Sequence, residues 1–97
     1  MKIEIYGIPS EVSRCAGCEY AKKLLDSVKL TYSFNEVIHK DQNDLGFSFN
    51  RPLIEECAKR IGCFPNLNLR YPVIFVDDVK ITSIKDHLLS LGYNLDD

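Results

Sequence analysis

The chain has 97 residues, of which 45% are hydrophobic and 27% are charged, a composition typical of one globular domain spanning residues 1–97. Its 12 basic and 14 acidic residues give a net charge of −2, which excludes the strongly basic surface of most nucleic acid-binding proteins. No apolar run approaches the roughly 18 residues of a membrane span, and the N-terminus does not resemble a signal peptide. We therefore expect a cytoplasmic monomer that binds neither nucleic acid nor membrane, with its four cysteines in a reducing compartment.

The first part of the chain predicts a strand, a helix and a second strand. Residues 2–6 alternate between apolar and polar side chains, which indicates a strand. Residues 18 to about 28 predict an amphipathic helix, because four apolar residues follow the i, i+3, i+4, i+7 spacing: Ala21, Leu24, Leu25 and Val28. Residues 31–38 are rich in aromatic and β-branched side chains, typical of a strand. Such a unit predicts parallel strands joined by a right-handed crossover.

The middle of the chain predicts a long loop followed by a second helix. Residues 39–50 are mostly polar and contain a glycine, which favours a loop over a regular element. Residues 52–61 place their apolar side chains, including that of Cys57, on one face of a helix. Gly62 follows directly and is suited to end this helix.

The last part of the chain predicts two strands and a third helix. Pro72 opens a run of four apolar residues, 73–76, which indicates a central strand covered on both faces. Residues 79–82 return as its hairpin partner. Ser83 and Asp86 have the spacing of a capping box, which predicts that a helix begins directly after Ser83. The predicted order is β-α-β-α-β-β-α, an α/β fold.

Cys15 and Cys18 form a C-x-x-C motif between the first strand and the first helix, a setting typical of thioredoxin-like redox centres. Cys15 would stand at the helix N-terminus, where backbone N–H groups stabilise a thiolate, and Arg14 adds a positive charge. Thiols in such motifs have pKa values of about 3.5 to 7, against about 8.5 for free cysteine. We predict that Cys15 attacks a substrate disulfide and that the more shielded Cys18 resolves the mixed disulfide.

The remaining two cysteines leave a metal site as an alternative. Cys57 and Cys63 could bind zinc together with the C-x-x-C pair, although their C-x5-C spacing departs from that of paired zinc motifs. Cys57 lies on the apolar face of its predicted helix, where a free cysteine behaves as a small hydrophobic residue. We therefore favour redox chemistry without a metal at the first pair and a packing role for Cys57. The role of Cys63 stays open.

With these residues placed, the chain resembles the glutaredoxins of the thioredoxin superfamily, and is most similar to the short phage-type members, also described as phage thioredoxins. The resemblance rests on residues 5–7, 15–18, 21–25 and 71–76. It implies a thioredoxin fold, with a four-stranded mixed sheet flanked by three helices. It also implies a dithiol–disulfide oxidoreductase without a tightly bound cofactor, reduced by glutathione. A ribonucleotide reductase is the most plausible acceptor among its protein disulfide substrates.

The resemblance further assigns a substrate-binding region. Pro72 matches a cis-proline that faces the redox pair, and the backbone of Tyr71 would pair with glutathione or a peptide like an added strand. Thr82 and Ser83 stand where the family has a Gly-Gly pair before the last helix. The N–H groups at the start of that helix could hold a carboxylate. Arg14 is a further candidate contact for a substrate carboxylate or an acidic protein tail.

Two alternatives come with the departures from the family pattern. Gly17 stands where glutaredoxins usually carry an aromatic residue, which leaves the Cys15 sulfur more open to bulky protein disulfides. Gly17 and the Thr82–Ser83 pair are also compatible with a thioredoxin-type carrier that a flavoprotein reductase reduces. The other alternative is not an enzyme. In some family members the first cysteine and glutathione hold a [2Fe–2S] cluster between two subunits, and Cys15 could do the same.

Overall fold

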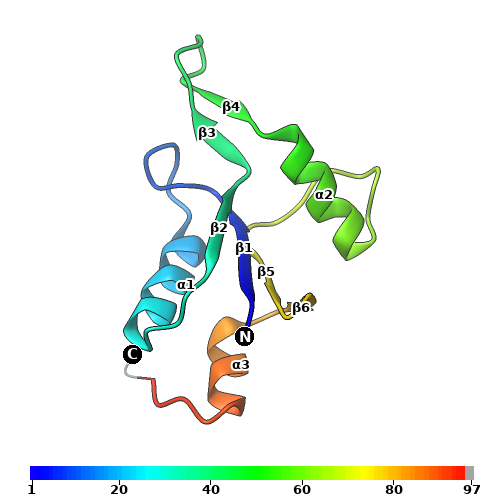
Figure 1. Ribbon diagram of the computed structural model, residues 1–97. Helices are drawn as coiled ribbons and strands as arrows, with labels where there is room; N and C mark the ends of the chain where they lie inside the picture. Colours follow the sequence, from blue (N-terminus) through cyan, green and yellow to red (C-terminus); the bar gives the residue numbers. More distant parts are fainter. Residues whose placement is uncertain (96–97) are drawn as a thin grey trace.

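The computed structural model describes residues 1–95, within which six strands and three helices occur (Figure 1). In chain order the elements are β1 (Ile3–Gly7), α1 (Ala16–Ser27), β2 (Ser33–Glu36), β3 (Ile38–Lys40), β4 (Phe47–Phe49), α2 (Arg51–Ile61), β5 (Val73–Val76), β6 (Val79–Ile81) and α3 (Ile84–Ser90). The predicted mixed α/β class and the three helices are confirmed. The described chain has two strands more than the predicted order.

Four strands form one mixed sheet in the order β2-β1-β5-β6. β1 and β2 are parallel, whereas β5 is antiparallel to both β1 and β6. Tyr6, near the end of β1, pairs with Asn35 on one side and with Val73, the first residue of β5, on the other. The last residues of β1 and β2 and the first residue of β5 therefore lie at the same end of the sheet. The segment that leads from β1 to α1 starts at this end of the sheet, and the segment before β5 arrives there (Figure 1).

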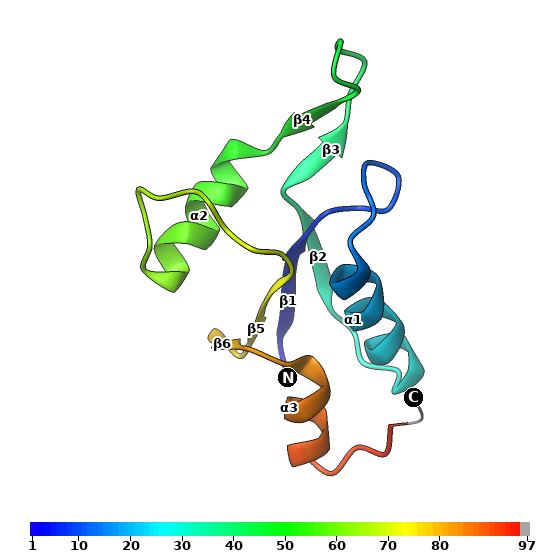
Figure 2. The ribbon, with the colours of Figure 1, turned by 180° about the vertical axis from the view of Figure 1, so that it is seen from behind.

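Helices cover both faces of the sheet, with α1 and α3 on one face and α2 on the other (Figure 2). The β5 strand shows why two layers are needed, because all four of its side chains are buried. Ile74 and Val76 pack into a core with α1 and α3, while Val73 and Phe75 pack into a second core with α2. This alternation confirms the predicted central strand covered on both faces.

The helices end where the sequence contains capping residues. The Ser83 hydroxyl accepts a hydrogen bond from the Asp86 N–H at 3.2 Å, which confirms the predicted start of α3. The Asn50 side chain accepts from the Leu53 N–H at 3.4 Å and starts α2. Gly62 ends α2 with a left-handed φ of 82°, a conformation that suits glycine.

The prediction of a loop over residues 39–50 is wrong in part, because this segment forms most of an antiparallel hairpin. β3 and β4 pair with each other, His39 opposite Ser48, and the two strands project from the main sheet (Figure 1). We call residues 38–49 the β3–β4 arm. The expected strand over residues 31–38 is divided by the fully buried Val37, so that β2 ends at Glu36 and β3 begins the arm. A two-stranded ribbon exposes most of its side chains and therefore tolerates the polar sequence that suggested a loop.

Arg60 fastens α2 to the sheet. Its two Nη atoms donate to the two carboxylate oxygens of Glu4 at 3.0 Å each, and Nη1 also donates to the Tyr6 hydroxyl at 3.0 Å. The Tyr6 hydroxyl in turn donates to Glu56 at 2.6 Å, and the guanidinium lies 3.8 Å above the Phe75 ring. Burial and the hydrogen bond to Glu56 raise the pKa of Tyr6 to about 12. The Glu4 carboxylate raises the pKa of Arg60 above its ordinary value.

Candidate functional site

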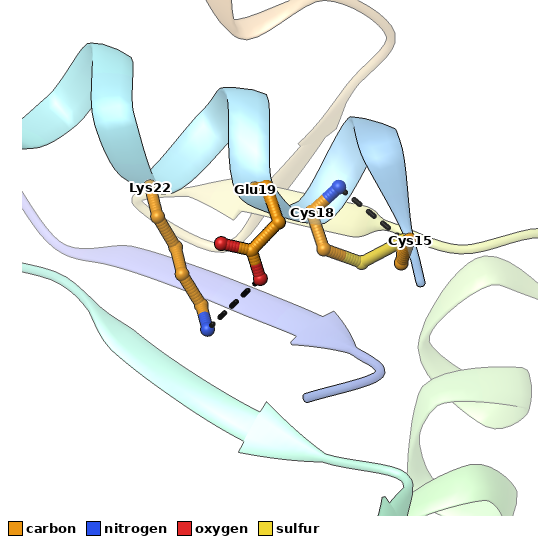
Figure 3. Close-up of a disulfide and its surroundings, with 4 residues drawn as sticks. All are labelled: Cys15, Cys18, Glu19 and Lys22. Carbon is orange, nitrogen blue, oxygen red and sulfur yellow. Dashed lines mark hydrogen bonds and ion pairs between the residues drawn. A yellow bond between two sulfur atoms is a disulfide. The ribbon is translucent and has the colours of Figure 1, made fainter. Parts of the chain in front are cut away.

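A disulfide joins Cys15 and Cys18 at the start of α1, with 5.2 Å between their Cα atoms (Figure 3). Cys15 is the N-cap residue of the helix, and its Sγ accepts a hydrogen bond from the Cys18 N–H at 3.3 Å. The position predicted for Cys15 is thus confirmed. Cys18 is fully buried, whereas Cys15 is partly exposed. A reactant from solvent therefore reaches Cys15 first.

The end of β1 lies close to the sulfur of Cys18. A Cβ atom added to Gly7, at the end of β1, would lie 2.8 Å from the Cys18 Sγ and 3.0 Å from the Phe34 ring. Only a glycine fits this contact without a shift of the sulfur or the ring. The Lys22 ammonium lies over the Phe34 ring, 3.8 Å from the ring centroid. The sequence pattern indicates that a strand ends near Gly7 but does not predict its contact with Cys18.

An ion pair follows the disulfide along α1. Lys22 Nζ lies 3.9 Å from Glu19 Oε1, and Glu19 is the residue directly after Cys18 (Figure 3). This oxygen is shielded from solvent and has no hydrogen-bond donor among the described residues. The Glu19–Lys22 contact therefore places a half-buried charge pair in the first two turns of the helix that carries the redox cysteines.

Pro72 lies against the turn between the two cysteines. A Cβ atom added to Gly17 would lie 2.9 Å from Pro72 Cδ, so the absence of a side chain at Gly17 permits this close approach. The Tyr71–Pro72 peptide bond is cis, as the resemblance implies. A second cis bond, Phe64–Pro65, has no signal in the sequence.

Three of the predicted substrate-binding residues line one groove of about 250 Å³: Pro72, Thr82 and Ser83. Gly17 and Tyr20 of α1 line the same groove, which places it beside the C-x-x-C turn. The other two predicted residues are elsewhere. Arg14 is exposed and does not line this groove, and Tyr71 lines a separate pocket beside the β3–β4 arm. The structure therefore divides four of the predicted binding residues between this groove and that pocket, and Arg14 lines neither.

The other two cysteines have different surroundings. Cys57 is fully buried between α2 and the sheet, which confirms its packing position, and burial raises the pKa of its thiol to about 11. Cys63 is partly exposed, and its Sγ donates to the Asn66 carbonyl at 3.3 Å. Within residues 1–95 no group of three or more histidine, cysteine or acidic side chains could hold a metal ion. The four-cysteine zinc site considered from the sequence therefore lacks its ligand cluster in this part of the chain.

The fold and the site together define a class: a mixed α/β protein with a C-x-x-C disulfide at a helix N-terminus, packed against a cis-proline. The chain is 46% identical over 98 residues to a protein of Enterobacteria phage T4, described as an uncharacterized 11.8 kDa protein in the Gp55–nrdG intergenic region. The alignment covers 98% of this chain and 92% of the T4 protein. The chain belongs to the family of that phage protein.

No model of a known protein family matches the chain. In the described part of the chain, none of the helices is both long and apolar enough to cross a membrane.

Proposed function

We propose that this chain is a dithiol–disulfide oxidoreductase of glutaredoxin type, in which Cys15 and Cys18 alternate between dithiol and disulfide. The observation that carries the proposal is the asymmetry of the pair, with a partly exposed Cys15 at the N-cap of α1 and a fully buried Cys18. The sheet order β2-β1-β5-β6 with helices on both faces agrees with a thioredoxin fold, to which the β3–β4 arm is an addition. We expect this single domain to act as a monomer in the cytoplasm.

The reaction begins from the reduced pair. The N–H groups at the start of α1 stabilise the Cys15 thiolate, which attacks one sulfur of a substrate disulfide and releases the other as a thiolate. Cys18 then loses its proton and attacks the Cys15 sulfur of the mixed disulfide. This step releases the second substrate thiol and forms the Cys15–Cys18 disulfide. Two electrons have passed to the substrate, and two glutathione molecules restore the dithiol while forming glutathione disulfide.

The surroundings of the pair suit this order of attack. Cys18 is fully buried with Gly7 close to its sulfur, whereas Cys15 is partly exposed, so an incoming disulfide meets Cys15. The groove lined by Pro72, Thr82 and Ser83 starts beside Gly17 and is the candidate site for glutathione. The backbone of Tyr71 would pair with the bound peptide like an added strand.

The acceptor we propose is a protein disulfide, with ribonucleotide reductase as the first candidate. The resemblance to phage-type glutaredoxins suggests this acceptor. The described position of the T4 relative, next to nrdG, agrees with a role in nucleotide metabolism.

A thioredoxin-type carrier is the second candidate, and Gly17 favours it because this position lacks the aromatic residue usual in glutaredoxins. Turnover of a small disulfide should be measured with glutathione plus glutathione reductase and, separately, with a thioredoxin reductase. We expect the glutathione system to support turnover and the Cys15→Ser variant to show none. Turnover with the thioredoxin reductase alone would identify a carrier, and no turnover with either donor would contradict an oxidoreductase.

The cluster-binding alternative would use the same accessible Cys15 together with glutathione. Iron analysis of anaerobically purified protein separates it from the proposed function. A preparation without iron that turns over disulfides supports the oxidoreductase, whereas an iron-containing dimer without turnover supports the cluster binder.

A further inference from the structure

The β3–β4 arm is firmly hydrogen-bonded yet exposes apolar side chains. At its tip, the Asn43 side chain donates to the Phe47 carbonyl at 2.9 Å and to the Ser48 hydroxyl at 3.0 Å, and accepts from the Leu45 N–H at 3.1 Å. The Ser48 hydroxyl also donates to the Asp41 carboxylate. Leu45 is nevertheless 71% exposed. An arm held so well is a defined surface rather than a loose loop.

A pocket of about 380 Å³ lies at the base of this arm, between the arm, the start of α2 and residues 67–71. Most of its lining is aliphatic or aromatic: Val37, Ile38, Phe49, Arg51, Ile54, Leu67, Asn68, Leu69 and Tyr71. Ligand pockets in proteins measure about 300 to 1,000 Å³, so this one is at the small end and suits a single large side chain. Phe49 lines the pocket although it is 60% exposed, and it forms an edge-to-face pair with Phe47.

Two series of contacts connect this pocket with the redox pair. Val37 lines the pocket, and its N–H donates to the Gly7 carbonyl at 3.0 Å. Gly7 in turn lies against the Cys18 sulfur. In the second series, Tyr71 lines the pocket, and the next residue, Pro72, lies against the C-x-x-C turn. A substrate segment bound in the pocket is therefore only a few residues, along the substrate, from a disulfide that meets Cys15.

The charges around the pocket favour an acidic ligand. Among the described residues that line it, Arg51 is the one with a charge, and its side chain is 73% exposed. Its Nε lies 3.5 Å from Glu55, an exposed i, i+4 contact of the kind that contributes little and can yield to another carboxylate. Arg70 is exposed between two lining residues of the pocket, and Arg14 is exposed beside Cys15. Arg51 thus brings one exposed guanidinium group to the lining of the pocket, and Arg70 carries a second next to two lining residues, in a chain whose net charge is −2.

We propose that the pocket between the β3–β4 arm and α2 binds a large apolar side chain of the protein that carries the substrate disulfide. The same segment of that protein carries carboxylates, which pair with Arg51 and Arg70. The proposal rests on the proposed function and adds its substrate class. Glutathione has no large apolar side chain, so the pocket would distinguish protein disulfides from small ones without taking part in the chemistry.

The test uses three synthetic peptides that share one internal disulfide. The first has a phenylalanine and two aspartates after the second half-cystine, the second has alanine in place of phenylalanine, and the third has lysines in place of the aspartates. We expect kcat/KM for the first peptide to exceed that of either control by about tenfold, the effect of one well-buried anchor. The Phe49→Ser variant should reduce the preference over the alanine peptide to about twofold or less, and the Arg51→Glu variant should do the same to the preference over the lysine peptide, while turnover of hydroxyethyl disulfide stays unchanged.

Val79→Ser and Lys23→Glu are matched controls, because both positions are exposed and lie outside the pocket. They should retain the full preference for the first peptide. Equal kcat/KM for all three peptides, with normal turnover of hydroxyethyl disulfide, would overturn the pocket and leave the proposed function intact. A dimer of the free protein that Phe49→Ser dissociates would also overturn it, because the pocket would then hold a second copy.

Failure of the proposed function itself gives a different result, the absence of turnover with every disulfide. Binding then decides the proposal, by NMR titration of the protein with serine-for-cysteine versions of the three peptides. Shifts at Val37, Phe49 and Tyr71 with the first peptide, and weaker ones with the controls, support the pocket. Shifts that are equal for all three peptides, or absent, overturn it.

Discussion

Replacing Cys15 with serine should abolish disulfide reduction, because the substituted hydroxyl supplies no thiolate at the start of α1. We expect a loss of roughly a thousandfold or more, as for removal of other enzyme nucleophiles. Cys18→Ser should instead keep the first attack and lose the resolving step, so that a mixed disulfide accumulates on Cys15. Activity assays and non-reducing gels of each variant, incubated with a protein disulfide, measure the two effects.

Cys63→Ser is the matched control for these variants, since Cys63 is a partly exposed thiol outside the pair. It should turn over disulfides like the unchanged protein and trap no partner. The assignment of roles is wrong if both single variants of the C-x-x-C pair keep normal turnover, or if Cys15→Ser accumulates the mixed disulfide.

Replacing Arg60 with alanine should lower the free energy of unfolding by about 2–3 kcal/mol. Loss of one partner from a buried ion pair costs about 3–5 kcal/mol, and the Arg60 side chain is 22% exposed, which reduces the effect. The substitution leaves the Glu4 carboxylate, whose side chain is only 16% exposed, without the two hydrogen bonds that Arg60 donates. It also removes the guanidinium stacked on Phe75. Urea unfolding followed by circular dichroism measures the change.

Arg51→Ala is the control on the same helix. Arg51 forms an exposed i, i+4 pair with Glu55, and such pairs contribute about 0.3–0.5 kcal/mol. An equally small loss for Arg60→Ala would show that the contact with Glu4 does not hold α2 on the sheet.

Much of the fold follows from local signals in the sequence. Residues 73–76 predict a buried strand because four consecutive apolar side chains need cover on both faces, and β5 has these bounds. Ser83 and Gly62 mark helix ends because each satisfies backbone groups at its own position. Cys15 and Cys18 belong to this group too, since the motif and the helix start are adjacent in the chain.

The parts that escaped prediction depend on contacts between distant segments. The β3–β4 arm is polar, and only the pairing of its two strands with each other distinguishes it from a loop. The contact of Gly7 with Cys18 and that of Gly17 with Pro72 arise from packing of the sheet against α1, which no local spacing encodes. Tyr71 follows the same rule, because it lines a pocket that exists only once residues 67–71 lie against the arm and α2.

The central claim is that Cys15 and Cys18 form a reversible two-electron redox centre. Equilibration of the protein in glutathione buffers of graded potential, followed by acid trapping and mass spectrometry, measures the fraction of the pair that is oxidised. We predict a single reversible two-electron transition with a midpoint between about −270 and −120 mV, the range of thioredoxin-like centres. A pair that stays fully reduced or fully oxidised across all buffers would contradict the claim.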